Sequence, residues 1–165
     1  MDDIAKRILS DVNLDDVSSH GVDRISGDRS PVDHWSPAIL LERAAYLRKM
    51  AKYGNGSASD TIKALPHYSA VLSFQGRTSD AEVHENHTCL FHVLSGTATL
   101  VTGGTLTGPM QAGGGVVRGD SIENGSRQEL RQGDVVHIPA GVPHQFLIAG
   151  EKAITCLIVK IAEAK

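Results

Sequence analysis

The chain has few aromatic residues, two cysteines and no long apolar run. Aromatics make up only 4% of its 165 residues, so a core must be built mainly from Val, Ile, Leu and Ala. No apolar run approaches the roughly 18 residues of a membrane span. No basic region followed by an apolar one opens the sequence, so we expect no secretory signal. A net charge of -3 without a Lys/Arg cluster gives no indication of nucleic-acid binding.

The cysteines, Cys89 and Cys156, lie far apart in the sequence. They could pair in the fold, but free thiols are the usual state in a cytoplasmic protein. We therefore expect a cytoplasmic protein of one domain with no membrane partner.

Two segments precede the part of the chain that is rich in β-type patterns. Residues 1–35 are acidic and rich in Asp, Ser and Gly, with one possible short helix at its start, Asp2 to Ser10. They predict either a solvated arm or an arm that packs on a partner subunit. Residues 36–54 predict a helix that covers one end of a sheet, with a Ser cap, a Pro at its first position and a Gly stop. We expect its buried face to hold Ile39, Ala45, Tyr46, Met50 and Tyr53.

From residue 68 onward, short β-type runs alternate with glycine-rich turns, which predicts a sandwich or barrel. The segment Gly103–Gly115 is too glycine-rich for a core and predicts a long hairpin loop or a flap over a cavity. The expected strands are Tyr68–Phe74, Glu82–His84, Leu90–Leu94, Thr97–Thr102, Gly115–Ser121, Gln128–Leu130, Val135–Ile138, Gln145–Ala149 and Ile154–Ile161.

A turn, a strand and a rigid corner lead to one histidine, His144. Gly133 and Asp134 supply the turn, β-branched residues follow, and Pro139 ends their strand. The corner Pro-Ala-Gly-Val-Pro then places His144 at the start of the next strand. A histidine held in this way suits a metal ligand or a general base.

A second cluster of polar residues begins at Glu82. Residues two apart in a strand face the same side, so Glu82 and His84 can both point into one cavity. His87 is an odd step away, but the turn-like residues around it can bring it back. If the next strand has Cys89 facing inward, Phe91 and Val93 face inward as well, and His92 faces outward.

These two stretches resemble the two halves of the cupin signature. The second half is matched in full by Gly133, Pro139, Gly141 and His144, while Ile148 stands where the family often has asparagine. The first half in the family is His, any residue, His, a few residues, Glu, six residues, Gly.

Counting back from Gly96 places Cys89 on the family's Glu, His84 on its second His and Glu82 on its first. One of the three first-half ligands therefore matches by type. The resemblance covers about residues 68–160.

The resemblance implies an all-β fold, an antiparallel jelly-roll barrel over residues 68–162, with a helical extension before it. Cupins commonly bind one divalent metal, are often homodimers, and include dioxygenases, isomerases, lyases, regulators and storage proteins. Fold alone does not choose among these.

Two histidines and one carboxylate, His84, His144 and Glu82, would suit Fe(II), Mn or Ni with open positions for a substrate. Cys89 as a fourth ligand would favour Zn, and His87 is a further candidate. Without a metal, a histidine beside Glu82 could act as a general base, so Glu82 and His84 are the candidate catalytic residues. The predicted pocket is lined by Phe91, Val93, His137 and Phe146.

Two functions follow from this reading. The first is a metal-dependent enzyme, a dioxygenase, isomerase or lyase, acting on a small oxygenated substrate. The second, favoured by the altered first motif, is a non-catalytic module that binds a small molecule or regulates, with a weakened or lost metal site.

Overall fold

The computed structural model describes residues 32–164, and the chain from Pro37 onward forms one compact unit. The predicted arm over residues 1–35 and its short helix lie outside the described residues apart from 32–35, which have no regular secondary structure. No helix in residues 32–164 has the length and apolarity that a bilayer span requires.

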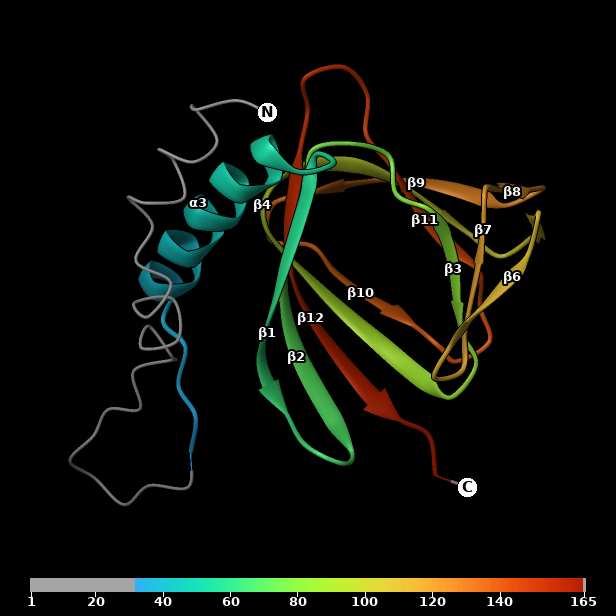
Figure 1. Ribbon diagram of the computed structural model, residues 1–165, viewed down its shortest axis with the longest axis horizontal. Helices are drawn as coiled ribbons and strands as arrows, with labels where there is room; N and C mark the ends of the chain where they lie inside the picture. Colours follow the sequence, from blue (N-terminus) through green and yellow to red (C-terminus); the bar gives the residue numbers. More distant parts are fainter. Residues whose placement is uncertain (1–31, 165) are drawn as a thin grey trace, which may run out of the picture. The chain divides into compact units, whose positions relative to one another are not determined.

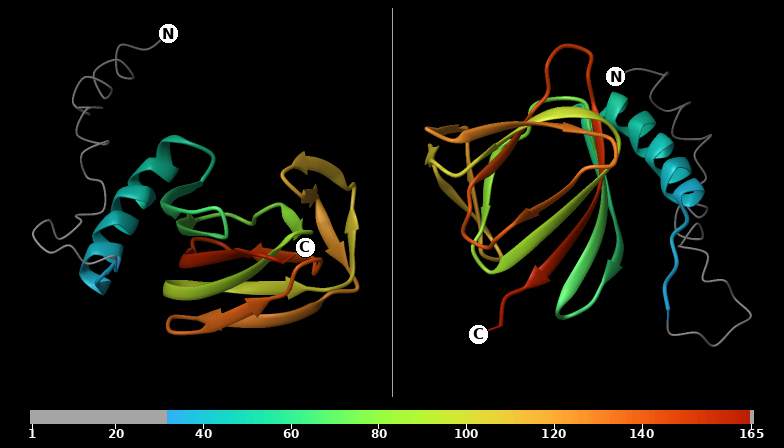
Figure 2. Two further views of the ribbon diagram at one scale, coloured as in Figure 1. Left: turned by 90° about the horizontal axis from the view of Figure 1, so that it is seen from below. Right: turned by 180° about the vertical axis from the view of Figure 1, so that it is seen from behind.

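Antiparallel strands dominate this unit and curl around a common interior (Figures 1 and 2). A ten-stranded sheet has the order β1-β2-β12-β4-β11-β3-β7-β6, with β9 and β10 also paired to β4, and β5 pairs with β8. This confirms the all-β jelly-roll prediction. The strands are β1 (Ser57–Ala64), β2 (Tyr68–Gln75), β3 (Ala81–His84), β4 (His87–Thr102), β5 (Thr105–Thr107), β6 (Met110–Gly113), β7 (Val116–Gly119), β8 (Ser121–Glu123), β9 (Ser126–Arg131), β10 (Val135–Ile138), β11 (His144–Leu147) and β12 (Ile154–Ala162).

Strand β4 connects the two halves of the barrel. The sequence predicted two strands here, but residues 87–102 form one strand whose first half pairs with β10 and β12 and whose second half pairs with β9 and β11. Gly96 lies between the halves with a φ of 83°, and the pairing with β12 shifts register close by. A bend at this glycine lets one strand serve both faces of the barrel.

Helix α3 (Pro37–Tyr53) has the predicted bounds to within a residue and contacts β1 and β2. Its predicted buried face is wrong. The buried stripe is Leu40, Ala44, Leu47 and Ala51, whereas Ile39, Tyr46, Met50 and Tyr53 are exposed. Both stripes repeat with a helical period, and the one with two alanines lets the helix pack closely on the sheet.

Two parts of the sheet were not predicted. Strand β1 was missed because its only buried side chain is Ile62, yet it pairs along its length with β2, and Asp60 on it forms an ion pair with Arg43 of the helix. The segment Gly103–Gly115 is not one long loop, since it contains β5 and β6, which pair with β8 and β7 respectively. Pairing, rather than side-chain burial, supports these strands.

The barrel interior holds the main hydrophobic core. As predicted, Cys89, Phe91 and Val93 face inward and His92 faces solvent. The opposite face of β2, with Ala70, Leu72 and Phe74, is buried separately on the side that α3 contacts. The core cluster consists of Cys89, Phe91, Val93, Ala98, Leu100, Leu130, Ile138, Phe146, Ile154, Cys156 and Ile158.

Candidate metal site

Three polar side chains from two neighbouring strands meet inside the barrel. His144 begins β11 and lies directly opposite Glu82 of β3 in the antiparallel register. His84 follows two residues after Glu82 and so faces the same side. The relative exposure is 6% for His84 and 5% for His144, and 29% for the Glu82 side chain. Strand pairing therefore brings together residues that are about 60 positions apart in the sequence.

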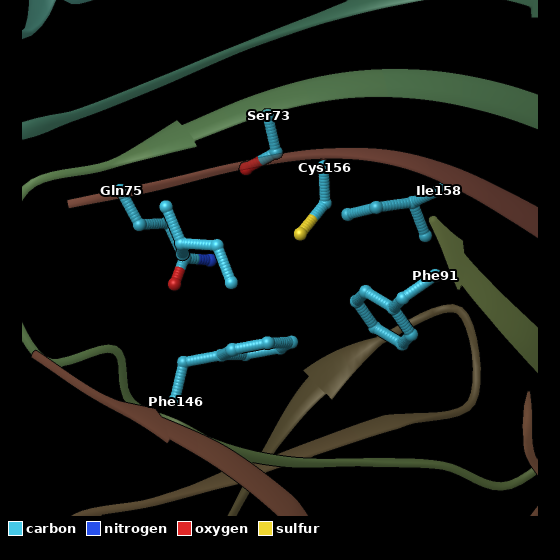
Figure 3. Close-up of a pocket in the computed structure, with 7 residues that line it drawn as sticks. Ser73, Gln75, Phe91, Phe146, Cys156 and Ile158 are labelled. Atoms are coloured by element: carbon cyan, nitrogen blue, oxygen red, sulfur yellow. The ribbon is translucent and has the colours of Figure 1, made fainter. Parts of the chain in front are cut away.

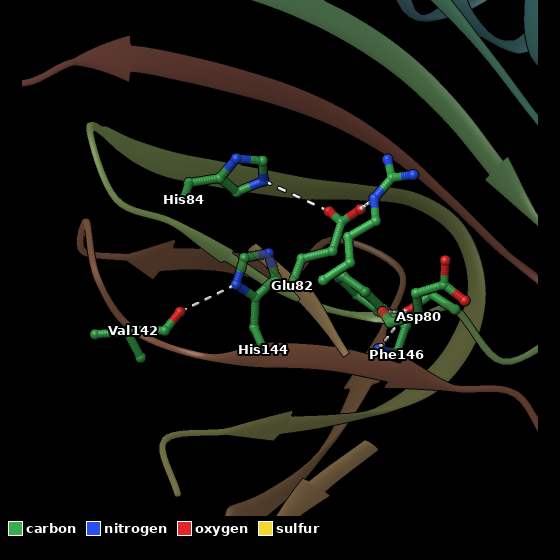
Figure 4. A network of polar contacts seen from close by, with 8 residues as sticks. Asp80, Glu82, His84, Val142, His144 and Phe146 are labelled. Atoms are coloured by element: carbon green, nitrogen blue, oxygen red, sulfur yellow. Dashed lines mark hydrogen bonds and ion pairs between the residues drawn. The ribbon is translucent and has the colours of Figure 1, made fainter. Parts of the chain in front are cut away.

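The ligand atoms of Glu82, His84 and His144 all lie within 4.8 Å of one another (Figure 4). The ring centroids of the two histidines are 5.5 Å apart, with the planes inclined by 29°. Nε2 of His84 is 3.6 Å from Oε2 of Glu82. One ion can therefore be reached by all three side chains.

The corner before His144 fixes its ring. Nδ1 of His144 lies 3.2 Å from the carbonyl oxygen of Val142, and because a carbonyl only accepts, Nδ1 carries the proton and donates it. The lone pair of Nε2 is then free for a ligand. The amide of Gly141, which has a φ of 78°, donates to the carbonyl oxygen of His84 at 2.9 Å. The Pro-Gly corner thus ties the two histidine-bearing strands together.

The electrostatics around Glu82 and His144 favour the protonation states in which these side chains bind a metal. The polar contact with His84, 3.6 Å away, holds the pKa of Glu82 down at about 2, against burial, and the Arg118 guanidinium contributes to the lowering. Burial lowers the pKa of His144. At neutral pH the carboxyl is therefore ionised and the His144 imidazole neutral, which are the forms that bind a metal. The donor set fits a divalent transition metal.

A protein-family model described as Cupin domain matches residues 72–160, which are more than half of the chain. The chain belongs to the cupin family.

Solved structures share the cupin fold. TT1209 from Thermus thermophilus aligns with a TM-score of 0.52 at 17% identity, covering 75% of this chain and 95% of that one. An uncharacterized conserved protein with a double-stranded beta-helix domain, from Klebsiella pneumoniae subsp. pneumoniae, gives a TM-score of 0.50 at 16% identity, covering 66% of this chain and 79% of that one. No curated protein sequence matches this cupin. At such identities the likeness shows the fold alone.

Two of the residues considered as cupin ligands lie outside the group of three. Cys89 faces inward but is packed in the hydrophobic core, and burial raises the pKa of its thiol, so it is not a ready thiolate. His87 is half-buried at the start of β4 and faces the same side as Cys89, yet its ring is not part of the group. Cys89 and Cys156 are both free and buried.

Of the four predicted pocket residues, two line a space in the barrel and two do not. Phe91 and Phe146 line a space in the barrel interior, and Val93 is buried in the core without lining it. The prediction for His137 is wrong, because alternation along β10 turns Val136 and Ile138 inward and exposes His137.

Figure 3 shows the side chains that line this space. The space is narrow: its empty volume is about 170 Å³ with the part open to solvent included, and no part of it is wide enough for a water molecule. Phe91 lines this space and also contacts the metal group, since its ring centroid lies 5.9 Å from that of His144 and 5.2 Å from that of Phe146. Sequence reasoning missed the lining residues of β2 and β12, which alternation along those strands could have identified. These are Ser73, Gln75, Ile154, Cys156 and Ile158.

Arg118 was also missed. It lies opposite Glu82 in the register of β3 and β7, and its Nε donates to Oε1 of Glu82 at 3.0 Å. Nothing in the chain order points to this pairing, because β7 follows a glycine-rich segment of unpredicted length and register.

Proposed function

We propose that this cupin is a metal-dependent enzyme that acts on a small oxygenated substrate. The convergence of Glu82, His84 and His144 within 4.8 Å carries the proposal. Two histidines and one carboxylate suit Fe, Mn, Ni or Zn and leave further positions for a substrate. When bound, the ion supplies Lewis-acid chemistry at an oxygen of that substrate.

The low pKa of Glu82 assigns its role within the group. A carboxylate with a pKa of about 2 is a weak base, so Glu82 suits metal binding better than proton abstraction. Nδ1 of His144 donates to the carbonyl oxygen of Val142, which leaves Nε2 as the nitrogen that can bind an ion. Nε2 of His84 contacts Oε2 of Glu82, and a bound ion would replace that contact.

The metal content of variants tests the proposal. We expect untagged protein dialysed against Fe, Mn, Ni or Zn to retain about one ion per chain, and His144→Gln and Glu82→Gln each to weaken metal affinity by about 100-fold or more. Elemental analysis after dialysis measures this. The matched control is His137→Gln, since that histidine also lies on the barrel but faces solvent, and it should retain metal.

Two results would overturn the proposal. One is wild-type protein that retains none of the four metals. The other is metal retained equally by His144→Gln, because the ion would then be bound elsewhere.

A non-catalytic binding or regulatory module is the second candidate. The observation that favours it is Cys89, which replaces the family's Glu and belongs to the core rather than to the site. Metal binding with no effect on any small oxygenated substrate would favour this candidate.

A second copy of the chain is the partner that we infer. The inference rests on the outer faces of β10, β4 and β12, which adjoin one another. On these faces His92 of β4 pairs with Val135 of β10 and with Leu157 of β12. Leu90 of β4 pairs with Val159 of β12. Val135 and Leu90 are exposed. Within the described strands this face carries no Lys, Arg, Asp or Glu side chain, so two copies can meet on it without like-charge repulsion.

Sedimentation equilibrium tests the dimer. We expect wild-type protein to be dimeric and Leu90→Glu to be monomeric, because the dimer would bury two new charges. Leu65→Glu, at an exposed leucine in the turn between β1 and β2, is the control and should remain dimeric. Monomeric wild-type protein would contradict the inference.

A further inference from the structure

Two positively charged side chains flank the group formed by Glu82, His84 and His144. Arg118 on β7 uses Nε to contact Glu82, which leaves the two terminal nitrogens of its guanidinium for another acceptor. Its side chain is 55% exposed, so these nitrogens are reachable from solvent. Arg118 therefore stands at an open side of the site.

Lys160 lies on another strand, β12. It lies directly opposite Cys89 in the register of β12 and β4, so its side chain leaves the sheet on the inward face that Cys89 occupies. Lys160 is half-buried, and among residues 32–164 no carboxylate forms an ion pair with it.

The charge of Lys160 lies inside the barrel, on the face of β12 that meets the buried Cys89. Burial raises the pKa of Cys89, and Lys160 opposes that rise, as a nearby positive charge does.

Arg118 and Lys160 together carry more positive charge than Glu82 offsets. Glu82 is the only carboxylate in the group, and it already faces Arg118 and His84. A divalent ion at the site would add further positive charge. A half-buried ammonium without a partner is unfavourable, so an incoming anion would be stabilised by both cations and would relieve this imbalance.

We propose that the substrate is a small carboxylic acid whose carboxylate binds the free guanidinium nitrogens of Arg118, with Lys160 supplying a second positive charge from β12. The substrate class rests on the proposed function, but the anion contact itself does not need a metal. A planar carboxylate matches the planar guanidinium, and such charge-assisted contacts are among the stronger polar ones. Arg118 and Lys160 are then specificity residues, while Glu82, His84 and His144 hold the ion.

Chemical-shift titration with propionate tests this, in metal-free and metal-loaded protein at constant ionic strength. We expect propionate to bind more tightly than neutral propionamide and more tightly than inorganic phosphate. Arg118→Gln and Lys160→Gln should each weaken propionate binding by about 10-fold or more, and Arg118→Lys should restore part of it. The controls are Arg127→Gln and Lys152→Gln, at exposed positions away from the site, which should bind propionate as wild type does.

Metal content, measured on the same samples, separates the two proposals. One result is protein that retains no metal and still prefers propionate in a way that depends on Arg118 and Lys160. That result would contradict the enzyme proposal and support the anion site. Equal binding of propionate and propionamide, or variants that bind like wild type, would overturn the anion site whatever the metal content. Tighter binding of phosphate would overturn the carboxylate assignment. Should Arg118→Gln fail to fold, Lys160→Gln carries the test alone.

Discussion

Replacing Gly96 with alanine is expected to destabilise the barrel by about 3 kcal/mol or more. Gly96 has a φ of 83°, where an L-residue is strained by about 1–2 kcal/mol. An added Cβ would also lie 2.0 Å from the carbonyl oxygen of Ala153, a backbone atom that can move only with β12. Since β12 and β4 share the barrel core, the strain spreads through the sheet.

Urea unfolding of Gly96→Ala and Gly133→Ala separates the two causes. Gly133 has a φ of 93°, but no heavy atom of a non-adjacent residue in 32–164 lies within 4 Å of the Cβ position there, so its alanine variant suffers the backbone strain alone. We expect the Gly96 variant to lose clearly more free energy of unfolding than the Gly133 variant. Equal losses would mean that the contact with Ala153 relaxes freely and that the bend of β4 tolerates a side chain.

The turns on either side of β10 show why much of the fold could be predicted from the sequence. Gly133, Pro139 and Gly141 act locally, by turning the chain where its backbone must bend, and local signals of this kind are visible in a sequence. The strand Val135–Ile138 between them has the predicted bounds. Strand β1 was missed and the buried face of α3 was predicted wrongly, because each depends on the neighbour it packs against rather than on its own pattern.

The same distinction applies to the site. Glu82 and His84 share a strand, so period-two alternation predicts that they face one side, and the corner predicts a fixed His144. The meeting of these three residues depends on the pairing of β11 with β3, for which the family resemblance was the only guide. Arg118 and Lys160 came from β7 and β12, whose registers no short motif specifies.

Metal-free protein is expected to lose stability on acidification in two separate pH ranges. His144 has a lowered pKa in the folded state, so the unfolded chain binds its proton more readily, and stability falls as the pH drops through the ordinary value of 6.5. Glu82 also has a lowered pKa, from 4.5 to about 2, so its contribution is present above pH 4.5 and is lost as the pH falls toward 2. At about 1.4 kcal/mol per pKa unit, the Glu82 contribution is about 3 kcal/mol.

Urea unfolding between pH 8 and pH 3, with a chelator present, resolves the two ranges through variants. Glu82→Gln should be less stable than wild type at neutral pH by up to that amount, and the difference should shrink below pH 4.5 because neutral glutamine has no charge to lose. His144→Gln should remove the slope at and just below pH 6.5 and keep the lower one. Glu151→Gln, at an exposed carboxyl group, should follow the wild-type profile. If Glu82→Gln kept a constant difference from wild type down to pH 3, the contacts with His84 and Arg118 would not be holding the carboxylate ionised, and the case for Glu82 as a ready-made ligand would fail with it.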